Sequence, residues 1–338
     1  MMTLVPNTST VRGSGNRHFL LVPGLVPDGP ETFWRQQRVL RKFGWTTTMT
    51  YPNQGFDVEI TLQAIRDFIT STRAQGRAPV LVGVSVGGGL CLEALRRARA
   101  AGEELPLAGL ILISPFSCVD DLAPLLKRLL QPIIAEVDKA DGNPQTHVAR
   151  GRAFFKSLAA KALRPKGDAP KGMEPPLWRQ LFSLLTPSGF TEFREARIRR
   201  RIEATLDHLP DQGAIGRVVA LRHLLGPSVG PHADKPLTSA PTMILWGSKE
   251  RHTLNMEGPG TAILCRPDLA WKVLPNVEIH WVYDHDGSEV PHASLLKHSR
   301  PFNTHLRRFL KRTSKGHAIN AAKTALIAPL AVIGLARW

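Results

Sequence analysis

The chain has 338 residues, of which 43% are apolar and 21% charged, and this composition is ordinary for a soluble globular protein with a substantial core. Its net charge is +16, but nine Lys and Arg residues and no Asp or Glu lie between Lys297 and Trp338. The rest of the chain is only mildly basic and carries no nucleic-acid-binding signature. We therefore expect no nucleic-acid partner.

The three cysteines have no paired spacing, so they predict neither a disulfide framework nor a zinc site. No other metal or cofactor pattern is present, and we expect no cofactor. The first 18 residues lack the apolar stretch of a secretory signal, which favours a cytoplasmic protein. Residues 1–16 are expected to form a flexible N-terminus.

Short apolar runs alternate with longer amphipathic segments along most of the chain. The predicted strands are continuously apolar, which indicates burial on both faces and hence a mostly parallel sheet flanked by helices, an α/β fold. Before residue 117, the pattern predicts strands at 18–24, 46–51, 78–85 and 107–115, and helices at 31–44, 58–76 and 87–102. After residue 240, it predicts strands at 241–248 and 277–284, and helices near 260–272 and at 293–311.

The alternation breaks between residues 117 and 240, where several prolines and a basic stretch, Arg197–Arg201, occur. This region is predicted to be a mostly helical cap insertion. The core then consists of residues 17–116 and 241–312, and residues 313–338 form a basic and apolar tail. A substrate-binding role for the apolar side chains of the insertion and plain packing against the sheet both remain open.

Gly83-Val84-Ser85-Val86-Gly87 matches the nucleophile-elbow pattern G-x-S-x-G and lies between a predicted strand and a predicted helix. A serine on such a strained turn is lifted clear of the sheet, and glycines two positions away avoid collision with neighbouring backbone. The Val86 N–H then lies at a helix start, where orphan donors favour an oxyanion. The alternative is a glycine-rich turn with a buried serine.

With this motif in place, the order of elements resembles the α/β-hydrolase fold with an inserted cap, over roughly Arg17 to Arg312. In that family a second oxyanion donor comes from the loop after an early strand. The matching loop here is Val22-Pro23-Gly24-Leu25, so the resemblance implies the Leu25 N–H, with Pro23 in place of the usual histidine. A simple Pro-Gly turn at a strand end is the alternative.

The resemblance also implies an acid after the strand that follows the cap and a histidine after the last strand. Glu250 stands at the acid position, where aspartate is commoner, and Asp120 and Asp121 are rivals on an earlier strand. Glutamate is able to accept the imidazole N–H and stabilise its cation, whereas a solvated surface carboxylate is the other interpretation. His292, directly before the predicted last helix, is favoured as the base over His285.

The order Ser85, Glu250, His292 is the one this fold requires. It predicts a serine hydrolase that acts on a small-molecule carboxylic ester or thioester through an acyl-enzyme. An acyltransferase and a non-catalytic α/β-hydrolase-like binding protein are the alternatives. Epoxide hydrolases and dehalogenases of this fold carry aspartate at the elbow and are not expected.

The segment Ile319–Trp338 is apolar and follows a basic run, a combination that suits contact with a membrane surface. Lys323 and Pro329 argue against a span. Peripheral membrane contact through the tail is therefore one hypothesis, and a helix docked on the body or a frayed terminus are its alternatives.

Overall fold

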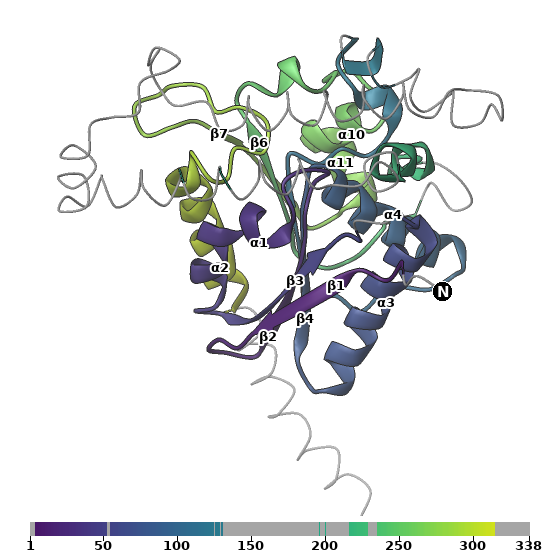
Figure 1. Ribbon diagram of the computed structural model, residues 1–338, viewed down its shortest axis with the longest axis vertical. Helices are drawn as coiled ribbons and strands as arrows, with labels where there is room; N and C mark the ends of the chain where they lie inside the picture. Colours follow the sequence, from purple (N-terminus) through teal and green to yellow (C-terminus); the bar gives the residue numbers. More distant parts are fainter. Residues whose placement is uncertain are drawn as a thin grey trace, which may run out of the picture.

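The computed structural model describes residues 4–52, 55–124, 126–128, 130, 196, 200, 216–228 and 235–314. These residues contain a seven-stranded sheet with the order β1-β3-β2-β4-β5-β6-β7 (Figure 1). Strand β1 pairs antiparallel with β3, and all other neighbouring strands pair in parallel. The strands are β1 (Asn7–Val11), β2 (Arg17–Val22), β3 (Gly44–Thr50), β4 (Ala78–Val84), β5 (Gly109–Ile113), β6 (Thr242–Gly247) and β7 (Val277–Val282).

The sequence patterns explain why these strands lie at the centre of the molecule. Every residue of β2, β5 and β6 is buried, because helices cover both faces of the sheet. Strand β7 is only partly buried, as suits the strand at the sheet edge. The predicted α/β class with a mostly parallel sheet is confirmed.

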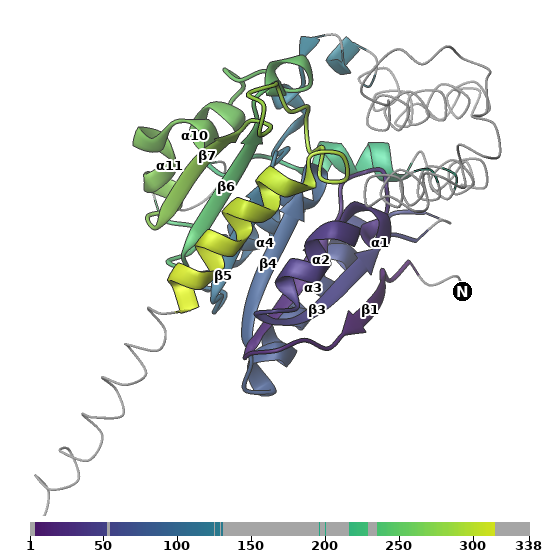
Figure 2. The same ribbon diagram turned by 90° about the vertical axis from the view of Figure 1, so that its left-hand side faces the viewer.

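Helices flank the sheet in two layers (Figures 1 and 2). On one side lie α1 (Gly29–Thr32), α2 (Trp34–Leu40) and the helical residues 299–314. Leu40 of α2 and apolar side chains of residues 299–314 form one core cluster with the sheet. On the other side lie α3 (Val58–Ala74), α4 (Val86–Ala100), α10 (Thr261–Cys265) and α11 (Pro267–Val273), which contribute to a second cluster. The sheet is thus packed from both sides.

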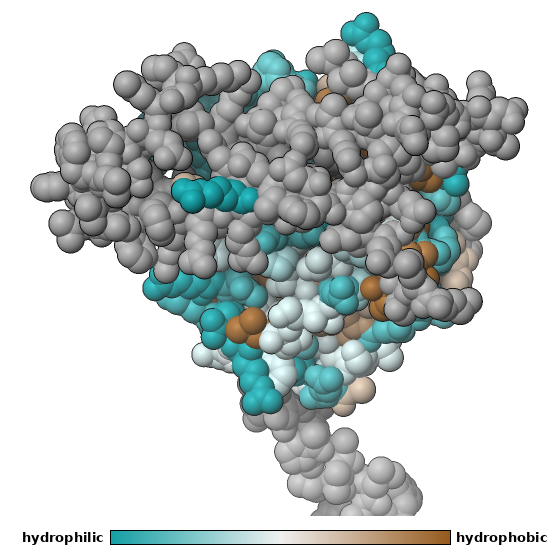
Figure 3. Space-filling view, in the orientation of Figure 1, coloured by the Kyte–Doolittle hydropathy of each residue, from teal (hydrophilic) through white to brown (hydrophobic). Residues whose placement is uncertain are grey.

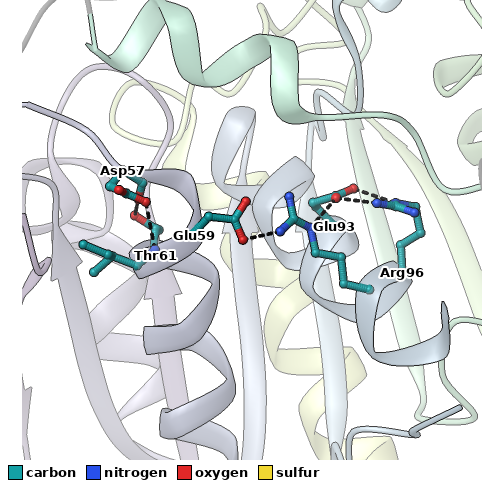
Figure 4. A network of polar contacts seen from close by, with 7 residues as sticks. Asp57, Glu59, Thr61, Glu93 and Arg96 are labelled. Atoms are coloured by element: carbon teal, nitrogen blue, oxygen red, sulfur yellow. Dashed lines mark hydrogen bonds and ion pairs between the residues drawn. The ribbon is translucent and has the colours of Figure 1, made fainter. Parts of the chain in front are cut away.

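A network of charged side chains joins α3 to α4 (Figure 4). The buried Glu93 carboxylate accepts hydrogen bonds from Arg96 Nη2 at 2.6 Å and from Arg97 Nε at 2.8 Å. Arg97 also pairs with Glu59 of α3. Because α4 begins directly after Ser85, these contacts help to fix the helix that follows the elbow.

The N-terminal prediction differs from the structure. Residues 7–11 form β1 along the edge of the sheet, although residues 1–16 are expected to be flexible. Four of the five residues of β1 are exposed and none carries an apolar side chain except Val11. The strand is held by its backbone pairing with β3, and hydrophobic periodicity does not detect such a strand.

Three predicted helices also differ in their extent. The segment 31–44 contains two helices that divide at Phe33, and the segment 260–272 divides before Pro267, whose ring cannot continue a helix. The last helix begins at residue 299 rather than 293, because Ala293 has a φ of 49° and turns the chain after His292.

The two ends of the insertion meet beside the sheet, where Cys118 and Leu225 form an antiparallel bridge. Several parts of the predicted insertion and tail lie outside the described residues: the apolar residues between Phe154 and Leu185, most of Arg197–Arg201, and the tail from residue 315.

None of the helices described here is long and apolar enough to cross a membrane. In the view of Figure 3, the coloured surface is mostly hydrophilic, with hydrophobic residues in small separate patches.

Candidate active site

The elbow sits at the end of β4, and its backbone is strained. Ser85 has φ 50° and ψ −119°, a conformation that L side chains rarely adopt. A Cβ on Gly83 would lie 2.6 Å from the Gly87 oxygen, and a Cβ on Gly87 would lie 2.2 Å from the Val22 oxygen. Larger residues at either position would displace backbone, which is the crowding that the G-x-S-x-G pattern indicates.

Ser85, His292 and Glu250 form one hydrogen-bonded chain. The Ser85 Oγ lies 2.9 Å from His292 Nε2, and His292 Nδ1 lies 2.5 Å from Glu250 Oε2. Glu250 is fully buried, whereas 17% of the His292 side chain is exposed. An ionised carboxylate only accepts, so Nδ1 carries the imidazole proton and Nε2 is the acceptor for the serine hydroxyl.

Each member of this chain comes from the carboxyl end of a parallel strand. Ser85 follows β4, Glu250 follows β6, and His292 lies in the segment after β7. In open α/β sheets, ligands bind in the crevice outside the carboxyl ends of the strands. The three side chains therefore lie together at the carboxyl ends of the strands, where a substrate is expected.

Ser114, directly after β5, joins the acid to the loop that carries the histidine. It is fully buried with φ 46°, and its Oγ donates to Glu250 Oε1 and accepts from the Ala293 N–H at 3.1 Å. The Gly247 N–H also donates to Glu250 Oε1, at 2.9 Å. Sequence reasoning missed Ser114. The signal in the sequence was its position: Ser114 directly follows the apolar run of β5, and β5 pairs with β4, the strand that ends before Ser85.

The rival acids take part in other contacts. Asp121 is buried and accepts hydrogen bonds from Ser117 Oγ at 2.6 Å and from the N–H groups of Gly260 and Thr261, both at 2.9 Å. Its carboxylate therefore fixes the start of α10. Asp120 is exposed and pairs with Lys127 at 2.5 Å.

The rival base is exposed as well. His285 Nδ1 lies 2.8 Å from Asp284 Oδ1, and two-thirds of the His285 side chain faces solvent. Asp284, His285 and Asp286 place three potential metal-ligand atoms within 4.8 Å of one another. The His285–Asp284 contact accounts for two of them, and exposed acidic groups of this kind are common without an ion.

The two predicted oxyanion donors belong to two segments that adjoin the serine, the start of α4 on one side and the loop after β2 on the other. Val86 is the first residue of α4, so its N–H has no partner inside the helix. On the other side, a Cβ built on Gly24 would lie 3.3 Å from Ser85 Cβ, so the loop of Leu25 packs directly against the nucleophile. A side chain at position 24 would therefore make a tighter contact than usual with Ser85, and Leu25 itself is half-buried.

The cysteines do not compete as nucleophiles. Burial raises the pKa of the Cys91 thiol far above neutral, and burial together with Asp121 raises the pKa of Cys118 to about 12. Burial also raises the pKa of Cys265. Near neutral pH all three thiols stay protonated, and the thiolate is the reactive form.

Comparison with known proteins agrees with this geometry. A family model described as the alpha/beta hydrolase family matches residues 19–295. MenH from S. aureus superposes with a TM-score of 0.54 at 16% identity, over 91% of this chain and 98% of its own. An esterase from Exiguobacterium antarcticum gives 0.53 at 14% (90% and 96% covered), and one from Thermogutta terrifontis 0.51 at 15% (91% and 94%). No curated protein matches the chain.

At these identities the solved structures show a shared fold and carry no information about the substrate. The family match covers most of the chain, from β2 to the loop that follows His292. The predicted family is confirmed: this chain belongs to the alpha/beta hydrolase family.

Proposed function

We propose that the protein is a serine hydrolase that cleaves a carboxylic ester or thioester through an acyl-enzyme. The observation that carries the proposal is the continuous contact from Ser85 Oγ through His292 to the buried Glu250. A serine hydroxyl is a weak nucleophile on its own, and an adjacent base oriented by a third group is what activates it.

In the first half of the reaction, His292 Nε2 takes the Ser85 proton while Oγ attacks the substrate carbonyl carbon. The resulting imidazolium is stabilised by Glu250, which accepts the Nδ1 hydrogen bond. The Leu25 and Val86 N–H groups stabilise the oxyanion. His292 then gives its proton to the leaving alcohol or thiol, and the acyl group remains on Ser85.

In the second half, a water molecule replaces the leaving group. His292 takes a proton from the water, whose oxygen attacks the acyl carbon, and the same two N–H groups stabilise the second oxyanion. Collapse of this intermediate returns the proton to Ser85 and releases a carboxylic acid. His292, at 17% exposure, is reachable by water, whereas Glu250 is not.

The test is a hydrolysis profile over oxygen esters and matched thioesters of increasing acyl length, with and without an added alcohol. We expect the wild type to release free acid, and Ser85→Ala to show no turnover above the uncatalysed rate. Undiminished turnover in Ser85→Ala would contradict the proposal. Predominant transfer to the alcohol would instead assign an acyltransferase on the same residues.

A further inference from the structure

Arg217, in the segment that returns from the insertion to the sheet, places a buried guanidinium group against the loop of Leu25. Its side chain is 2% exposed, and Nη1 donates to the Leu25 carbonyl oxygen at 2.9 Å. Its Nη2 lies 3.1 Å from Asp28 Oδ1, at the far end of the same loop. One side chain thus contacts the loop at two points.

Tyr51 holds the other side of this loop. Its hydroxyl donates to the Pro23 carbonyl oxygen at 2.7 Å, and the Arg217 guanidinium lies over the Tyr51 ring, 5.6 Å from its centroid. Tyr51 is itself 1% exposed. The two buried side chains thus contact each other and the loop.

These contacts flank the peptide that matters for catalysis. The Pro23 oxygen belongs to the peptide before Gly24, and the Leu25 oxygen belongs to the peptide after Leu25. The peptide between them links Gly24 to Leu25 and carries the Leu25 N–H. Glycine has the fewest steric limits on its dihedral angles, so this peptide would otherwise rotate easily. Fixing both neighbouring peptides restricts the rotation that would turn this N–H away from Ser85.

Burial of this guanidinium is costly unless it is paired, so its position needs a reason. Asp28 supplies the charge partner, although burial raises the pKa of the Asp28 carboxyl and Arg217 only partly offsets this effect. At Gly216 the segment also packs closely against Phe56, because a Cβ there would lie 2.7 Å from the Phe56 nitrogen. Arg217 is therefore held in one place by charge and by packing.

We propose that Arg217 is a positioning residue for the oxyanion hole, which holds the Leu25 peptide so that its N–H faces the developing oxyanion. This inference rests on the proposed hydrolase function. It also links the end of the insertion directly to the catalytic loop.

The test compares Arg217→Met with the wild type in steady-state kinetics on an ester that the wild type hydrolyses. Removal of an oxyanion donor costs about 10²–10³ in kcat, so its misplacement is expected to cost at least ~10-fold. Because the interaction acts in the transition state, kcat and kcat/KM should fall together while KM stays within about 2-fold. Arg217→Lys, which keeps the charge but lacks the planar fork, should lose less activity.

Arg99→Met is the matched control. Arg99 is also buried, and it donates to the carbonyl oxygens of Lys235 at 2.5 Å and Pro227 at 3.2 Å, away from the oxyanion loop. The Arg99→Met variant should lower the melting temperature as Arg217→Met does, but it should leave kcat unchanged. Equal kcat losses in both variants would reduce Arg217 to a stabilising residue and overturn the proposal, as would a raised KM with unchanged kcat.

Hydrogen exchange gives a readout that does not depend on turnover. Arg217→Met should increase amide exchange in the loop 23–28, and Arg99→Met should not. If Arg217→Met fails to fold, Arg217→Lys serves for both measurements. If the wild type neither hydrolyses esters nor reacts at Ser85, the proposed function fails. The exchange data still show whether Arg217 holds the loop, and unchanged exchange would overturn the inference.

Discussion

Both carboxylate oxygens of Glu250 have hydrogen-bond donors: Oε2 accepts from His292, and Oε1 accepts from Ser114 and from the Gly247 N–H. Three segments of the chain therefore meet at one buried charge. Glu250, in place of the commoner aspartate, begins the short helical turn η3 (Glu250–His252), which follows β6.

Ser114→Ala is predicted to lower kcat about 10-fold. The substitution removes a hydrogen bond to a buried charged group, which is worth about 1.5–3 kcal/mol, and leaves the Ala293 N–H beside His292 without its acceptor. The check is steady-state kinetics of this variant beside Ser117→Ala, because Ser117 is also a buried serine but donates to Asp121 and not to Glu250. Equal activity in the two variants would show that Ser114 does not orient the acid.

At the scale of single residues, the sequence predicted those site residues that lie in a motif or directly after a predicted strand. Ser85 came from its flanking glycines, and Glu250 and His292 came from their places after predicted strands; the structure brings all three together. Ser114 and Arg217 could not be found in this way, because their importance comes from contacts between positions far apart in the chain. Ser114 lies 136 residues from Glu250, and Arg217 lies 192 residues from Leu25.

At the scale of elements, His18 lies near the start of β2, at the opposite end of the strands from the site, and joins β2 to its neighbours. Its Nε2 lies 2.7 Å from Thr47 Oγ1 in β3, and its ring packs edge-on against Phe68 of α3 at 4.8 Å. Burial, with a smaller contribution from Arg77, lowers the pKa of His18 from 6.5 to about 4. The folded state therefore holds a neutral imidazole.

This shift predicts that His18 makes stability depend on pH. Because the folded pKa lies below the unfolded one, the unfolded state binds the proton first, and the contribution present above about pH 6.5 is lost as the pH falls toward 4. The loss from pH 7 to pH 4 is about 3 kcal/mol in the free energy of unfolding. In urea unfolding at a series of pH values, His18→Gln should lack this pH-dependent loss of unfolding free energy. His252→Gln, which changes an exposed histidine, should follow the wild type. Identical pH profiles for His18→Gln and the wild type would refute the prediction.

The predicted strands match the structure more closely than the predicted helices. A buried parallel strand is a continuous apolar run with clear ends, as in β5 and β6. Helix boundaries depend on local breaks such as Pro267 and on the turn at Ala293, which the amphipathic pattern runs through without a change. The edge strand β1 has no apolar pattern at all, so only its pairing reveals it.

At the scale of the whole molecule, the net charge of +16 is concentrated near the C-terminus, where apolar residues follow the cations. We propose that this tail contacts an anionic membrane surface, where each Lys or Arg contributes about 1 kcal/mol. In liposome flotation with anionic vesicles, the full chain should float and a chain ending at Lys315 should not. Flotation of neither protein, or of both to the same extent, would remove this role from the tail.

The central claim is that the Ser85 hydroxyl is the activated nucleophile of the molecule. Its most direct test is reaction with a fluorophosphonate probe, followed by mass spectrometry of the labelled peptide. The account predicts a single adduct on Ser85, complete in the wild type and absent from Ser85→Ala. A wild type that stays unlabelled, or a Ser85→Ala variant that is labelled as fast as the wild type, would contradict it.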